Sequence, residues 1–194
     1  MSIFELYLRL GFQHIADLRA YDHLVFIVAL CAVYRPGQWR LVAVLVTAFT
    51  VGHSSTLLLA TLGLIPVRPA VVEFLIPVTI LLTAMFNMRQ WRSGGGAADL
   101  RSTYAFPLIF GLIHGLGFSS YLRTLLGREA SLVQPLFAFN VGLEIGQLLI
   151  VTAVMGAASI ATLGLRVPHR AWSLALSGAA AGISLILMAR ANPW

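Results

Sequence analysis

Five ionisable side chains of this chain lie inside apolar stretches: Asp22, His23, His53, His114 and Glu144. An ionised group within the hydrocarbon of a bilayer costs several kcal/mol unless it is paired or hydrated, so each of them is a candidate for a functional site. Imidazole and carboxylate groups are also ligands that divalent transition metals accept. We therefore predict that these five side chains form a metal site.

Polar residues at helical spacing extend this set. Asn140 lies four residues before Glu144 and Gln147 lies three residues after it, so the three share one face of a helix. Hydroxyl residues also follow His53 within one helical turn. We predict that Asn140 is an additional ligand and that three residues line a pathway: Ser54, Thr56 and Gln147.

The ligand types also bear on which metal is bound. Imidazoles and carboxylates suit nickel, cobalt or zinc better than soft Cu(I), and geometry and metal availability decide among these divalent ions. The single cysteine, Cys31, cannot supply a pair of thiolates. The alternative interpretation of His53 or His114 taken alone is a hydrogen-bonding bridge between membrane helices.

The composition indicates a membrane protein. Of the 194 residues, 59% are hydrophobic and 10% are charged, with a mean hydropathy of +0.87, whereas a soluble domain is about 25% charged. All 13 basic residues are arginines, and they are scattered through short segments between the apolar stretches. This pattern favours anchoring at lipid headgroups over binding of nucleic acid.

The apolar stretches predict about six membrane crossings, since a crossing needs about 20 apolar residues. Their expected ranges are 18–34, 41–64, 67–91, 104–126, 132–163 and 172–189. Residues 1–13 place apolar side chains on one side and Glu5 and Arg9 on another, as an interfacial helix does. We predict an all-α polytopic membrane protein, a compact helical bundle forming one domain over residues 1–194.

Glycine pairs at four-residue spacing occur in three of these stretches: Gly111/Gly115, Gly142/Gly146 and Gly178/Gly182. Small residues let helix backbones approach closely where lipid provides no hydrophobic drive for association. We predict close helix contacts at each pair.

Sequence motifs carry a family resemblance from about Gly11 to Leu149. They are GFQHI and YDHLVF within 11–26, FTVGHSSTL at 49–57, FGLIHGLGFS at 110–119 and FNVGLEIGQL at 139–148. In this order they resemble the HupE/UreJ family of small membrane proteins, which are regarded as nickel or cobalt permeases.

The resemblance implies which positions handle the metal. These are His14, Asp22 and His23 in the first motif and His114 in the third, while His53 and Glu144 stand inside the other two motifs. One departure from the family pattern concerns His14. Residues 15–21 separate it from Asp22, and the family typically has a shorter segment there. We therefore place His14, like Asn140, among the additional metal ligands.

Our leading hypothesis is a membrane permease for a divalent transition metal, and nickel or cobalt is the metal that we expect. The alternative is a membrane-embedded metal-dependent hydrolase, in which a bound zinc-like ion activates water and Glu144 or Asp22 acts as general base. A third hypothesis is a metal sensor or assembly partner that transports nothing. We expect a transporter rather than an enzyme.

The expected partners are the metal ion and the lipid bilayer, without nucleic acid, and a homo-oligomer is left open. We expect an integral protein of a bacterial inner membrane. The arginines on the two sides are nearly balanced, and the slight excess favours an N-terminus outside.

Overall fold

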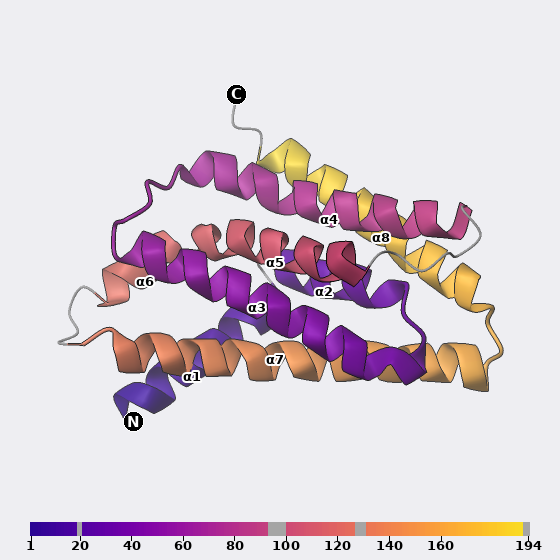
Figure 1. Ribbon diagram of the computed structural model, residues 1–194, viewed down its shortest axis with the longest axis horizontal. Coiled ribbons are helices and arrows are strands. Elements are labelled where there is room, and N and C mark those ends of the chain that lie inside the picture. The colour runs from indigo at the N-terminus through magenta and orange to yellow at the C-terminus, as the bar shows by residue number, and fades with distance from the viewer. Residues whose placement is uncertain (19–20, 93–99, 127–130, 192–194) are drawn as a thin grey trace.

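The computed structural model describes residues 1–18, 21–92, 100–126 and 131–191, and these residues form helices without strands. The elements are α1 (Ile3–Ala16), α2 (Asp22–Ala32), η1 (Pro36–Gln38), α3 (Trp39–Thr61), α4 (Pro69–Arg92), α5 (Leu100–Gly117), α6 (Ser119–Leu126), α7 (Val133–Ser159), η2 (Ile160–Gly164) and α8 (His169–Arg190). They form an elongated bundle with α7 and α1 on one side, α4 and α8 on the other, and α3 and α5 between them (Figure 1).

The described residues contain four helices that are long and apolar enough to cross a membrane: Pro36–Thr61, Pro69–Gln90, Val133–Gly164 and His169–Arg190. A fifth crossing results if the pair Tyr104–Gly117 and Ser119–Leu126, bent by 54°, counts as one span. The predicted all-α membrane fold is therefore confirmed, and the protein is an integral membrane protein.

The crossing predicted at 18–34 differs in the structure. There α2 has 11 residues, which at about 1.5 Å per residue covers roughly half of a hydrocarbon core about 30 Å thick. This helix packs against α4, α7 and α8, and most of its side chains are buried. It is thus a short helix inside the bundle.

A helix is present at the predicted N-terminal position as α1, and its interfacial location stays a prediction. It begins with a capping box in which Ser2 and Glu5 satisfy each other's backbone N–H groups. Its buried residues Tyr7, Gly11 and Ile15 lie on the side that packs along α7. This packing brings the last turn of α1 into the bundle.

Glycines bring α3 and α5 into backbone contact. A Cβ added to Gly52 would overlap the carbonyl oxygen of Leu108, and one added to Gly111 would overlap that of Phe49. A Cβ on Gly115 would overlap the carbonyl oxygen of His53. Only glycine fits at these positions, so the predicted role of the first glycine pair is confirmed.

A second glycine contact joins α1 to α7. A Cβ on Gly11 would overlap the carbonyl oxygen of Phe139, and one on Gly142 would overlap that of Leu8. Gly146 meets the side chain of Ile15. The third predicted pair is different, because a Cβ on either glycine of α8, Gly178 or Gly182, would meet nothing within 4 Å. Among the described residues, the α8 pair therefore mediates no close contact.

Replacing Gly111 by alanine should lower the melting temperature of the detergent-solubilised protein. The new Cβ must push α3 and α5 apart, and such overpacking costs about 1–3 kcal/mol. The matched variant Gly178→Ala meets open space and should be neutral or stabilising, because alanine has the higher helix propensity. An equal loss of thermal stability in both variants would contradict the backbone contact.

Candidate metal site

Three histidines from three different helices meet in the interior of the bundle. His14 comes from the last turn of α1, His23 from the first turn of α2 and His53 from the middle of α3. One ligand nitrogen from each lies within 4.8 Å of the others. His23 is 4% exposed and His53 is fully buried. Metal–nitrogen bonds of about 2.1 Å place two nitrogens on one ion at most about 4.2 Å apart, so a small shift of these side chains would bring all three onto one ion.

A fourth imidazole, that of His114 in α5, borders this group. The His23 ring lies 4.8 Å from the His14 ring, 5.7 Å from the His53 ring and 5.0 Å from the His114 ring, measured between centroids. His23 therefore stands between the other three. We name these residues together the histidine cluster: His14, His23, His53 and His114.

Each member of the cluster has a buried ring nitrogen without a hydrogen-bond partner among the described residues. These atoms are His14 Nε2, His23 Nε2, His53 Nδ1 and Nε2, and His114 Nδ1. Buried polar atoms in proteins are nearly always hydrogen-bonded, so a group of unpartnered nitrogens requires an explanation. A metal ion would coordinate such nitrogens.

Asp22 determines which nitrogen of His23 can accept a metal. Its Oδ1 lies 3.0 Å from His23 Nδ1 and also accepts the backbone N–H of His23 at 2.8 Å. A carboxylate oxygen only accepts, so Nδ1 carries the proton and the lone pair is on the buried Nε2. A carboxylate behind the imidazole is the usual outer-shell arrangement of metal-bound histidine.

Thr79 in α4 has the same effect on His114. Its hydroxyl lies 2.7 Å from the carbonyl oxygen of Ile76 and 2.8 Å from His114 Nε2. Because the hydroxyl has one proton and the carbonyl can only accept, both bonds form when His114 Nε2–H donates to the hydroxyl. The lone pair then lies on Nδ1, the unpartnered nitrogen of this ring.

Aromatic side chains enclose the histidine cluster. The Phe118 ring lies 4.0 Å from that of His14, and it stacks on Phe139 at 5.3 Å. Phe49 and Phe26 lie 5.1 Å and 5.2 Å from the His114 ring. His23, His53 and His114 are buried behind these apolar walls, which strengthens electrostatic interactions on that side of the cluster.

The predicted ligand Glu144 lies in a second polar group, between α3 and α7. Its two carboxylate oxygens accept hydrogen bonds from Thr47, at 2.6 Å, and from Thr50. The Thr50 hydroxyl is also 2.7 Å from the Gln147 side-chain oxygen. Glu144 is thus held by hydroxyl groups, and it is not part of the three-residue group that the described residues offer to a metal.

The remaining predicted residues lie on either side of α3. Ser54 donates to the Asn140 side-chain oxygen at 2.5 Å, which adds this pair to the polar group between α3 and α7. The Thr56 hydroxyl donates to the carbonyl oxygen of Leu112 at 2.7 Å. It therefore supports the contact with α5, and no pathway role for Thr56 follows from this contact.

Sequence reasoning missed Thr79, Thr47 and Thr50. A threonine hydroxyl in a membrane helix commonly bonds to its own helix backbone, and Thr50 and Thr79 make such contacts as well. Nothing in the spacing along one helix shows that the same hydroxyl reaches a histidine or a glutamate on another. The structure also places His14 in the compact group despite its altered spacing from Asp22.

Comparison with known proteins identifies a family but no individual relative. A family model described as HupE / UreJ protein matches residues 1–191. No curated protein and no solved structure matches the chain significantly. The matched range includes every residue of the histidine cluster and of the polar group between α3 and α7. The chain therefore belongs to the HupE/UreJ family, as its motifs predicted.

Proposed function

We propose that this protein is a permease that carries a divalent transition-metal ion, nickel or cobalt, across a bacterial inner membrane. The observation that supports this most directly is the group of His14, His23 and His53, whose ligand nitrogens lie within 4.8 Å of one another. Imidazole is a suitable ligand for nickel and for similar divalent ions. Membership of the HupE/UreJ family supports the same function.

The charge of the site suits transport better than permanent storage. The imidazoles bind metal in their neutral form, so the nearest negative charge is the carboxylate of Asp22, which is hydrogen-bonded to His23. One carboxylate leaves a divalent ion only partly neutralised. Binding of this kind selects the ion by its ligands and still allows it to leave, as transport requires.

A cavity of about 630 Å³ leads to the histidine cluster from the side of α1 and α6. We call it the α1–α6 cavity, and His14 and Asp17 are among the residues that line it. The imidazole of His14 is therefore the first member of the cluster that an ion arriving by this route would contact. We place the N-terminus on the outer side of the membrane.

The second polar group has a different role in this proposal. Glu144 and Asn140 lie along the contact of α3 with α7, one helical turn apart on α7. Their oxygens lower the cost of moving a positive ion beside the cluster, whereas the imidazoles provide the binding site. Binding and movement are thereby assigned to separate groups.

The hydrolase alternative has less geometric support. It requires a carboxylate that is free to take a proton from metal-bound water. Glu144 is engaged by Thr47 and Thr50, and the Oδ1 of Asp22 is engaged by His23. An enzyme would keep its metal through purification and show no flux, whereas a permease exchanges it.

Removing one imidazole tests the proposal. His53→Ala should strongly reduce nickel or cobalt uptake into reconstituted vesicles, because it removes a metal ligand. Loss of a residue that only supports a ligand costs roughly 10–100-fold, so loss of the ligand itself should cost more. The control is His169→Ala, because His169 lies at the start of α8 and its Nε2 contacts the carbonyl oxygen of Val33. Uptake should persist in this control. Equal uptake by wild type and His53→Ala, with both folded, would refute the site.

Asp22→Asn should weaken metal binding about 10–100-fold, because the amide no longer supplies the charge that orients and polarises His23. Isothermal titration calorimetry of the purified protein with nickel or cobalt measures the change in affinity. Glu73→Gln is the matched control, since Glu73 is an exposed carboxylate of α4 that does not line the α1–α6 cavity. Unchanged affinity in Asp22→Asn would show that this carboxylate has no role in binding.

Glu144→Gln should separate binding from movement. Because Glu144 contacts Thr47 and Thr50 rather than the cluster, equilibrium affinity should stay within about twofold of wild type. Uptake should slow by about tenfold or more, since the variant removes a carboxylate that offsets the cost of a cation inside the membrane. Parallel binding and flux assays on one preparation measure both. A loss of affinity as large as that of His53→Ala would place the carboxylate in the binding site instead.

A further inference from the structure

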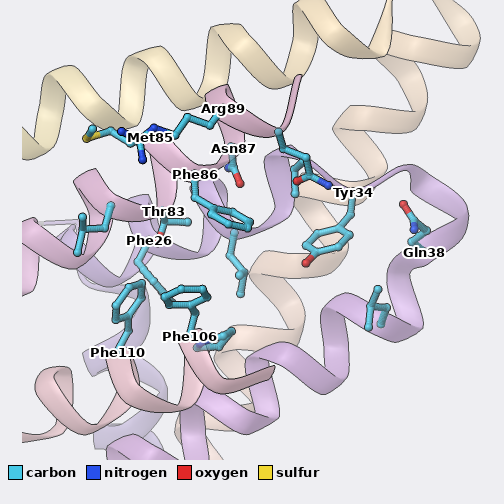
Figure 2. A pocket seen from close by; sticks show the side chains of 16 residues that line it. Phe26, Tyr34, Gln38, Thr83, Met85, Phe86, Asn87, Arg89, Phe106 and Phe110 are labelled. Carbon is cyan, nitrogen blue, oxygen red and sulfur yellow. The ribbon is translucent and has the colours of Figure 1, made fainter. Parts of the chain in front are cut away.

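The histidine cluster has a second cavity on its other side. This cavity, of about 420 Å³, lies between α2, the start of α3, α4 and α5, and we call it the α2–α5 cavity. Figure 2 shows Phe26, Phe106 and Phe110 together at one end of it and Tyr34 and Gln38 at the other. The cavity thus has three phenylalanine rings at one end and a phenol and an amide at the other.

The order of residues along α5 and α6 places the cluster between the two cavities. Phe106 and Phe110 line the α2–α5 cavity, and His114 follows in the cluster. Phe118 and Tyr121 come next and line the α1–α6 cavity. The two cavities therefore lie at opposite ends of the histidine cluster along the direction of the helices.

Phe26 forms the partition between the cluster and the α2–α5 cavity. Its ring lies 5.2 Å from the His114 ring on one side, and it lines the cavity on the other. It stacks on Phe49 at 4.8 Å and meets the edge of Phe110 at 6.1 Å. Phe26 is 1% exposed, so the partition is closed in this structure.

We propose that the Phe26 side chain is the gate through which a metal ion passes from the histidine cluster into the α2–α5 cavity, and that this cavity is the second half of its path. This inference rests on the proposed function. An apolar constriction holds back an ion because water and charge are both unfavourable there, and it opens when the blocking ring moves aside. The adjoining cavity has space for the ring.

The gate predicts that changes in the size of residue 26 alter flux more than they alter binding. Phe26→Ala should raise the rate of nickel or cobalt movement through reconstituted vesicles at least about fivefold, and Phe26→Trp should lower it by a similar factor. Equilibrium binding of the same ions to the purified protein should change less than flux in both, since no ligand nitrogen is removed and only the apolar wall beside His114 changes. Phe26→Leu replaces the alanine variant should that one fail to fold.

The control is Leu45→Ala, which truncates a fully buried side chain of α3 that lines neither cavity. It reports on loosened packing alone and should leave flux unchanged. If wild type binds and transports the metal while the Phe26 variants behave like the control, the gate is refuted and the permease stands. If wild type shows neither binding nor flux, the proposed function itself fails.

Discussion

Backbone contact between helices at glycine is the constraint on which the rest of this structure depends. Imidazoles are short side chains, so four of them on four helices meet only if those helices approach closely. Gly52, Gly111 and Gly115 bring α3 to α5, which places His53 beside the helix of His114. Gly11 and Gly142 do the same for α1 and α7, and the His14 ring thereby reaches the cluster. Within lipid, close packing of this kind replaces the hydrophobic effect as the source of association.

Once the helices are in place, hydrogen bonds orient the ligand nitrogens. Asp22 bonds to one ring nitrogen of His23, and Thr79 bonds to one ring nitrogen of His114. The other nitrogen of each ring is buried without a hydrogen-bond partner among the described residues. Both partners come from the same apolar surroundings as the histidines, where an unpaired polar group is costly. In the proposed metal site, this orientation of the imidazoles would reduce the reorganisation that binding requires.

The two polar groups have different surroundings. The histidine cluster packs against the rings of Phe49, Phe118 and Phe139, and it offers imidazole nitrogens. Glu144 is instead held by hydroxyls at the contact of α3 with α7, and it offers a carboxylate. The Phe26 ring separates the cluster from the α2–α5 cavity, whereas His14 itself lines the α1–α6 cavity, so an ion on the proposed path would have to pass an aromatic ring on one side of the cluster.

The sequence by itself determined the membrane fold, the family and the identity of the histidines, because apolar length, intramembrane charge and short motifs are local properties of a chain. It also predicted two of the three glycine contacts. Tertiary structure decided which polar residues share one site: it joined His14 to His23 and His53, assigned Glu144 to Thr47 and Thr50, and turned Thr56 toward Leu112. Helical periodicity relates residues on one helix, whereas contacts between helices depend on their crossing angles and rotations, which no single stretch of sequence encodes.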